Sequence, residues 1–134
     1  MPVGHGRAYP SHVSDDDITL VTFGNGVPMS LRAARNLAAA GIGARVFDLR
    51  WLAPLPEEEL LAEAERTGRV LVVDETRRSG GVSEGVITAL ADAGFAGRIA
   101  RVAAADSYVP LGDAASLVLV GEPEIEAAAR RLLR

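Results

Sequence analysis

Short apolar runs alternate along the chain with longer stretches in which apolar residues recur every three or four positions. The short runs are rich in Val, Ile, Leu and Phe, so they are predicted to be strands. Four of them cover Ile18–Phe23, Ala44–Leu49, Val70–Val73 and Ile99–Ala103. A candidate fifth strand covers Leu117–Val120. The continuous run Val70–Val73 is typical of a strand that is buried on both faces.

The stretches between these runs have the periodicity of helices. In the first one, Leu31, Leu37 and Ala38 lie on one face, Pro28 occupies the first turn and Gly41 ends the helix. Three further helices are predicted over residues 57–67, 82–93 and 122–133. Because strands alternate with helices, the sequence predicts an α/β fold with a largely parallel sheet covered by helices on both faces.

The first seventeen residues follow neither pattern. They hold Gly, Pro, Ser and His without an apolar period and end in three consecutive acids, Asp15–Asp17. We therefore divide the chain into a linker or N-terminal arm over residues 1–17 and one folded domain over residues 18–134. Such a beginning suggests a piece cut from a longer protein.

Composition excludes several classes of protein. The 134 residues include no cysteine, which rules out a disulfide scaffold and cysteine-bearing zinc sites. No apolar stretch approaches the ~18 residues of a membrane span, and the N-terminus lacks the pattern of a signal peptide. A net charge of −4 argues against a general nucleic-acid binder, and the absence of lysine excludes Schiff-base catalysis. The expected protein is a cytoplasmic domain without nucleic-acid or membrane partners.

The first strand and helix imitate a dinucleotide-binding turn. Gly24 and Gly26 follow the strand, and Asp48 ends the next strand about 20 residues downstream, as that motif requires. Met29 holds the third glycine position, where its side chain would crowd the helix against the strand. Pro28 removes a backbone donor from the turn that would bind a pyrophosphate. An ordinary strand-to-helix turn is therefore favoured over cofactor binding.

The densest charged cluster of the folded part combines Asp74 and Glu75 with Arg77 and Arg78. It follows a predicted strand, at the edge where open α/β sheets usually place ligands. Paired carboxylates could perform acid–base chemistry if the pKa of one were raised. A solvated loop at an interface, in which the charges neutralise one another, is the favoured interpretation.

Other candidate catalytic groups are incomplete. His5 and His12 are the only histidines, and both lie in the N-terminal arm, where they are expected to be solvated. A Ser–His–Asp arrangement therefore has no base in the folded part. Ser79 and Ser83 flank Gly80-Gly81, but without a G-x-S-x-G motif they are predicted to cap a helix.

Several motifs follow one another in a fixed order. Asp48-Leu49-Arg50 precedes Pro54-Leu55, and a strand ending in Asp74-Glu75 precedes Gly80-Gly81 at the start of a helix. Ala105–Pro110 is similar to a "PDTxVP" stretch, with Ala105 in place of the proline, and Pro2–Ala8 is similar to a "PxGKA" linker. In this order the motifs resemble the C-terminal domain of the transketolase superfamily, over about residues 17–133. The nearest branch is the E1 β subunit, or its fused α–β form, of thiamine-diphosphate-dependent 2-oxoacid dehydrogenases.

The resemblance implies a three-layer α/β/α domain whose five-stranded mixed sheet has one antiparallel strand. It also implies that the cofactor chemistry lies elsewhere, since in this family thiamine diphosphate and magnesium bind a G-D-G…N-N motif of another domain. Here Gly112-Asp113 is followed by Ala114, so the isolated chain is expected to be inert. No catalytic, cofactor-binding or metal-binding residue is assigned. The family-motif or interface candidates are Asp48, Arg50, Pro54, Leu55, Asp74, Glu75, Gly80, Gly81, Asp106 and Pro110.

The resemblance further implies partners. In this family the domain packs across a dimer two-fold, contacts the other domains or the α subunit of E1, and takes part in docking the E2 acyltransferase. That docking often sets acidic E1 residues against basic E2 residues, whereas the segment Phe95–Arg98 contains no acid. The whole assembly would decarboxylate a pyruvate-type or branched-chain 2-oxo acid and transfer the acyl group to lipoamide.

Two alternatives remain open. The chain could be a free-standing small-ligand or nucleotide-binding module that uses the sheet edge near Gly24–Gly26 and Asp74–Arg78. Within the superfamily, it could be a domain of a transketolase or a deoxyxylulose-phosphate synthase. The stretch Asp106–Pro110 favours the dehydrogenase branch.

Overall fold

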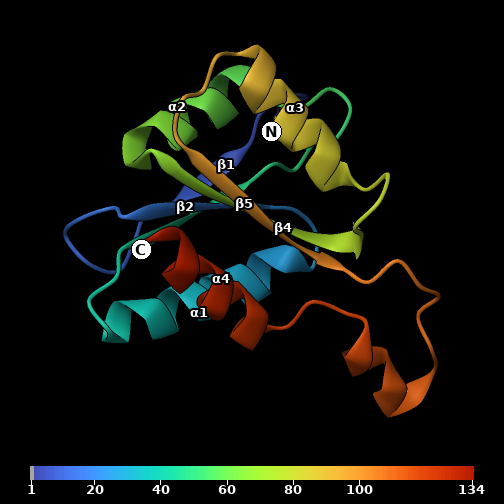
Figure 1. The fold of residues 1–134 in the computed structure, drawn as a ribbon. Coiled ribbons are helices and arrows are strands. Elements are labelled where there is room, and N and C mark those ends of the chain that lie inside the picture. Colours follow the sequence, from blue (N-terminus) through green and yellow to red (C-terminus); the bar gives the residue numbers. More distant parts are fainter. Residues whose placement is uncertain (1) are drawn as a thin grey trace.

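A five-stranded sheet lies between two pairs of helices in the computed structural model, which describes residues 2–134 (Figure 1). The elements are β1 Arg7–Tyr9, β2 Ile18–Thr22, α1 Gly26–Ala39, β3 Ala44–Asp48, α2 Glu57–Thr67, β4 Arg69–Arg77, α3 Val82–Asp92, β5 Arg98–Ala104, the 3₁₀ helix η1 Gly112–Leu117 and α4 Glu122–Leu132. The strand order is β1-β3-β2-β4-β5, with β1 antiparallel to β3 and the other pairs parallel. The predicted three-layer α/β/α fold with a mixed sheet is therefore confirmed.

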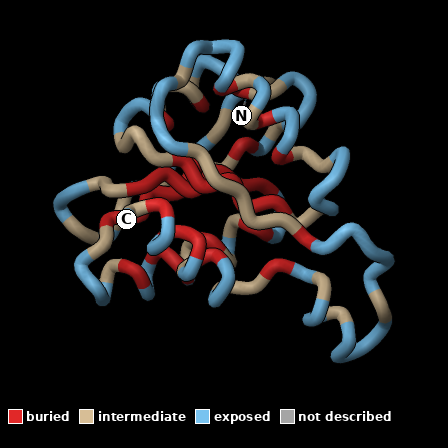
Figure 2. Tube along the Cα trace, viewed as in Figure 1, coloured by how far each residue is buried: buried red, intermediate tan, exposed pale blue. Residues whose placement is uncertain are grey.

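Two apolar clusters fill the spaces between the layers. Alternate residues of one strand point to opposite faces of a sheet, so each central strand contributes to both clusters. Leu20 and Val46 pack toward α1 and α4, whereas their neighbours Val21 and Phe47 pack toward α2 and α3. Figure 2 shows the buried residues concentrated along the sheet and on the inner sides of the helices. This burial explains why the strands are continuous apolar runs.

The antiparallel edge strand β1 lies inside the segment that the pattern predicts as an arm. Its register on β3 places Arg7 opposite Asp48 and Tyr9 opposite Val46. Tyr9 is half-buried against the cluster under α1. A strand of three residues is too short to show a hydrophobic period in the sequence. Its conformation is set by pairing with β3.

The prediction of a strand over Leu117–Val120 is wrong. Residues 112–117 form η1, and the backbone N–H groups of Val118 and Leu119 both donate to the carbonyl of Ala115. Val120 is buried in the core, whereas Leu117 is exposed. A short apolar run does not by itself distinguish a strand from other buried or exposed segments. The fifth strand of the sheet is β1 instead.

The helices agree with the predicted ranges to within two residues at most ends. Pro28 is the third residue of α1, where its missing N–H leaves no helical hydrogen bond unmade. Gly68, in the left-handed conformation, ends α2. Among residues 2–134, no helix combines the length and the hydropathy needed to cross a bilayer.

Candidate functional site

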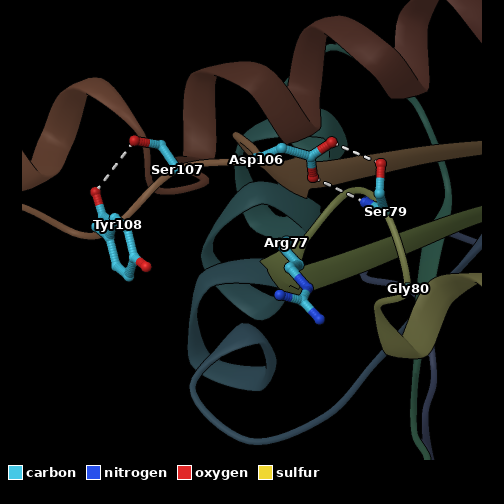
Figure 3. Close-up of a pocket in the computed structure, with 6 residues that line it drawn as sticks. All are labelled: Arg77, Ser79, Gly80, Asp106, Ser107 and Tyr108. Carbon is cyan, nitrogen blue, oxygen red and sulfur yellow. Dashed lines mark hydrogen bonds between the residues drawn. The ribbon is translucent and has the colours of Figure 1, made fainter.

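A hollow of about 780 Å³ opens at the carboxyl ends of β4 and β5 (Figure 3). This is the edge of the sheet where ligands of open α/β folds usually bind. Its lining residues come from the β4–α3 loop and from the segment after β5, and they are Arg77, Ser79, Gly80, Asp106, Ser107 and Tyr108. Two of the predicted candidates, Gly80 and Asp106, therefore lie together.

Asp74 lies in β4, three residues before the strand ends, and is completely buried. Its Oδ2 accepts a hydrogen bond from the backbone N–H of Ser83 at 2.6 Å, and its Oδ1 accepts from both the N–H and the hydroxyl of Thr76. The hydroxyl of Thr76 in turn accepts from the N–H of Val82 at 3.3 Å. The Asp74 carboxylate therefore caps the N-terminus of α3, and both of its oxygens are engaged.

Two predictions about this loop are wrong. Asp74 is not part of a solvated, neutralising loop, because it is fully buried and satisfied by backbone and hydroxyl donors. The hydroxyls of Ser79 and Ser83 do not cap α3, since Ser79 donates to Asp106 and Ser83 lies 3.3 Å from a guanidinium nitrogen of Arg101. The sequence predicted that Asp74 ends the strand, whereas β4 continues to Arg77, and the burial of Asp74 depends on the loop and helix that follow.

The loop needs glycine at Gly81. A Cβ at this position would lie 2.1 Å from the carbonyl oxygen of Arg77 and 2.7 Å from the hydroxyl oxygen of Thr76. This close approach lets the loop fold back over the Asp74 carboxylate and begin α3. The predicted Gly80-Gly81 motif is thus explained by packing of the loop.

Asp106 and Ser79 join the two sides of the hollow. The hydroxyl of Ser79 donates to Oδ2 of Asp106 at 2.6 Å, and the N–H of Ser79 donates to Oδ1 at 2.8 Å. These two hydrogen bonds lower the pKa of Asp106 below its ordinary value, because they stabilise the ionised carboxylate. The pair ties the β4–α3 loop to the segment after β5 (Figure 3).

Glu75 fills the turn that imitates a dinucleotide site. Its Oε1 accepts from the backbone N–H of Asn25 at 3.0 Å, directly before α1. A Cβ on Gly26 would lie 2.1 Å from the hydroxyl oxygen of Thr22, so this glycine serves the packing of α1 on the sheet. A negative carboxylate stands where a pyrophosphate would bind, which supports the prediction of an ordinary strand-to-helix turn.

The other motif candidates lie on the far side of β2, at the end of β3. Asp48 accepts from the backbone N–H of Arg50 at 3.0 Å, and its Oδ2 lies 3.6 Å from the Arg50 Nε. Arg50 has a φ of 58°, a conformation that this short-range bonding helps to hold. Pro54 follows in a cis peptide bond and Leu55 packs against the core. These four residues shape the β3–α2 connection and do not line the hollow.

The residues at the sheet edge do not fit magnesium and a diphosphate. The hollow holds one carboxylate, Asp106, whose two oxygens already accept from Ser79. The α3 N-terminus, which could bind a phosphate, is capped by Asp74. Among residues 2–134, no three His, Asp or Glu side chains are grouped in a way that could hold a metal ion.

Exposed apolar side chains collect on residues 105–119, which we call the protruding segment. Tyr108 is 97% exposed, Leu111 96% and Leu117 83%. The segment extends away from the body of the domain beyond the end of β5 (Figure 1), and most of it is exposed (Figure 2). Pro110, the last motif candidate, is half-buried within it. Sequence reasoning missed this surface because the apolar run at its end was interpreted as a core strand.

Large apolar side chains that are exposed on one segment usually mark a surface that another protein covers. A mixed sheet between two helix pairs defines an α/β/α domain, and the protruding segment lies beside it. The model of the transketolase C-terminal domain matches residues 8–122, and the chain belongs to this family. The family resemblance seen in the motifs is thereby confirmed.

Within this family, the chain is similar in sequence to β subunits of the pyruvate dehydrogenase E1 component. The β subunit of the pyruvate dehydrogenase E1 component from Bacillus subtilis (strain 168) is 34% identical over 120 residues, which cover 87% of this chain and 37% of the relative. The same subunit from Staphylococcus epidermidis (strain ATCC 12228) is 37% identical over 121 residues, covering 88% of this chain and 37% of the relative. The chain therefore spans little more than a third of the length of these relatives.

Solved structures share the fold. A split-gene transketolase, described as an inactive β4 tetramer, superposes with a TM-score of 0.86 at 26% identity, covering 99% of this chain and 42% of that one. A 2-oxoglutarate:ferredoxin oxidoreductase from Magnetococcus marinus superposes with a TM-score of 0.70 at 14% identity, covering 97% of this chain and 20% of that one. The second likeness concerns the fold alone.

Proposed function

We propose that the chain is the C-terminal domain of an E1 component, β subunit or fused α–β form, of a thiamine-diphosphate-dependent 2-oxoacid dehydrogenase. The 34% and 37% identity to pyruvate dehydrogenase E1 β subunits supports this branch over a transketolase or a deoxyxylulose-phosphate synthase. In the proposed assembly, which is cytoplasmic, a 2-oxo acid is decarboxylated and its acyl group passes to lipoamide. Thiamine diphosphate and magnesium belong to other parts of that assembly.

The role of this domain is association. The protruding segment is the observation that carries this proposal, because Tyr108, Leu111 and Leu117 leave large apolar side chains in water. Burial of each would contribute about 1.5–3 kcal/mol to a complex. The proposed partners are a second copy across a two-fold axis and the remaining domains or the α subunit of E1. Docking of the E2 acyltransferase is part of the proposal, but Phe95–Arg98 offers it no acidic residue.

Sedimentation equilibrium over a dilution series tests the association. The unaltered chain is expected to form a dimer, and Leu111→Ser combined with Leu117→Ser is expected to shift it to monomer. Leu52→Ser is the matched control, since Leu52 is an exposed leucine outside the protruding segment. A monomer at every concentration, or equal dissociation by the control, would overturn the proposed association.

Isothermal titration calorimetry with thiamine diphosphate and Mg²⁺ tests whether the cofactor site lies outside this chain. The capped α3 N-terminus and the engaged Asp106 predict no saturable heat for this chain alone. Saturable binding would overturn the proposal that the cofactor site lies elsewhere. It would instead favour the alternative of a small-ligand-binding module at the sheet edge.

A further inference from the structure

The strand β5 forms one outer edge of the sheet, and within residues 2–134 no strand pairs with its outer side. The N–H of Arg98 donates to Gly68, and the carbonyl of Ala104 accepts from Arg78, so the even-numbered residues direct their backbone groups toward β4. The backbone groups of Ile99, Arg101 and Ala103 therefore face the open edge. In Figure 1 this edge crosses the front of the molecule between the two helix layers. Such an edge can accept an additional strand.

A groove of about 440 Å³ lies between this edge and α4. Its apolar part is formed by Ala100 of β5, which packs on the side of α1 and α4, and by Ala128 and Leu132 of α4. Three arginines also line it, namely Arg98, Arg101 and Arg131. The groove thus offers backbone donors and acceptors, an apolar floor and positive charge to one bound segment.

The positive charge of this groove is largely uncompensated. Within residues 2–134, Arg98 and Arg131 make no ion pair, and no carboxylate lines the groove. Arg98 also stands opposite Arg69 in the β4–β5 register, an arrangement of like charges that costs stability. Arg101 is partly engaged, because it donates to the Arg78 carbonyl and lies 3.8 Å from Glu84. The chain as a whole carries a net charge of −4, so this groove runs against its overall charge.

We propose that the groove binds an extended, acidic segment of another protein, which adds to β5 as a further strand. Alternate side chains of such a strand point to one face, so acids two residues apart can meet Arg98 and Arg131 together. A second copy of this chain does not fit, since pairing of two β5 edges would bring the arginines of both copies together. This surface is separate from the protruding segment, and the inference does not depend on the proposed function.

The probe is a fluorescently labelled peptide of alternating Glu and Val, and fluorescence anisotropy measures its binding to the full chain. Saturable binding is expected, and it should weaken as salt is added. Arg98→Glu and Arg131→Glu should each weaken it by about tenfold, since each replaces an attraction with a repulsion. Arg35→Glu makes the same charge change on an exposed arginine of α1 and should leave binding within about twofold. Thermal melting confirms that each variant is folded, and Arg98→Gln replaces Arg98→Glu if it is not.

Two further probes test the mode of binding. The same peptide methylated on every backbone nitrogen cannot donate to β5 from either of its edges, so it should bind at least about tenfold more weakly. Equal binding of the methylated peptide would overturn strand addition. Absence of binding, equal weakening by Arg35→Glu, or tighter binding of a single-stranded DNA oligonucleotide would overturn the proposed acidic protein segment.

Discussion

Oδ2 of Asp74 accepts a hydrogen bond from the backbone N–H of Ser83, with 2.6 Å between oxygen and nitrogen, and this bond spans the loop that connects β4 to α3. A buried carboxylate is tolerated there because its oxygens accept from three donors, namely the N–H and the hydroxyl of Thr76 in β4 and the N–H of Ser83 in α3. The bond fixes where α3 begins, and with it the wall of the hollow at the sheet edge. The motif residue Asp74 therefore has a structural role.

Removal of the Asp74 carboxylate should destabilise the domain. Asp74→Ala is expected to lower the free energy of unfolding by about 2–3 kcal/mol, since it leaves buried N–H groups without an acceptor. Glu75→Ala is the control and should cost less than about 1 kcal/mol, because Glu75 is half-exposed and, in the part of the chain that the structure describes, accepts a hydrogen bond from Asn25 alone. Urea unfolding measures both values. Equal effects of the two substitutions would contradict the capping role.

Two glycines of the same region should respond in opposite ways. Gly81→Ala places a Cβ 2.1 Å from the Arg77 carbonyl oxygen, so it is expected to destabilise the domain by more than about 1 kcal/mol. Gly85 lies inside α3, where an added Cβ would meet no side chain or neighbouring element of residues 2–134 within 4 Å, so Gly85→Ala should stabilise the domain by about 0.5–1 kcal/mol. Thermal or urea unfolding distinguishes them. The loop geometry is refuted if Gly81→Ala is neutral.

The attachment of the N-terminal arm should depend on pH through Glu59. Its hydrogen bonds from His5 and from the N–H of Gly6 lower the pKa of Glu59 from its ordinary value of 4.5. Because the folded-state pKa is the lower one, this stabilisation is complete above the unfolded-state pKa and is lost as the pH falls through the folded-state pKa. Glu59→Gln should therefore lower the melting temperature at about pH 5.5 and have little effect at about pH 3.

The exposed residue Glu58 provides the control for this titration. It makes no ion pair within residues 2–134, so Glu58→Gln should leave the melting temperature unchanged at both pH values. A Glu59→Gln effect that is as large at the lower pH would show that packing, and not the ionised carboxylate, holds the arm.

The protruding segment should be dispensable for folding of the monomer. Leu111→Ser is expected to change the free energy of unfolding by less than about 0.5 kcal/mol, because the side chain is 96% exposed. Leu71→Ala, at a fully buried position of β4, should cost about 2–5 kcal/mol. Denaturant unfolding at low protein concentration measures both. A large loss for Leu111→Ser would mean that the segment packs on its own domain.

Prediction from sequence succeeded where the signal is local. The run Val70–Val73 is the buried centre of β4, and the predicted helix over residues 82–93 is α3 to within one residue. It failed for Leu117–Val120, whose apolar composition fits both a core strand and an exposed surface. It missed β1 because three residues carry no period. For the site, it placed Asp74 near the carboxyl edge of the sheet and named Asp106 as a motif candidate. It predicted neither the burial of Asp74 nor the hydrogen bonds that join Asp106 to Ser79.

The sequence by itself determined the order and type of most elements, since periodicity and turn residues act over a few neighbouring positions. Its motif order also determined the family. The tertiary structure decided what required contact between distant positions: the bond between Ser79 and Asp106, 27 residues apart, and the tie from Gly6 to Glu59, 53 residues apart. It also decided which strand became the open edge, because strand order depends on how the whole sheet packs between its helices.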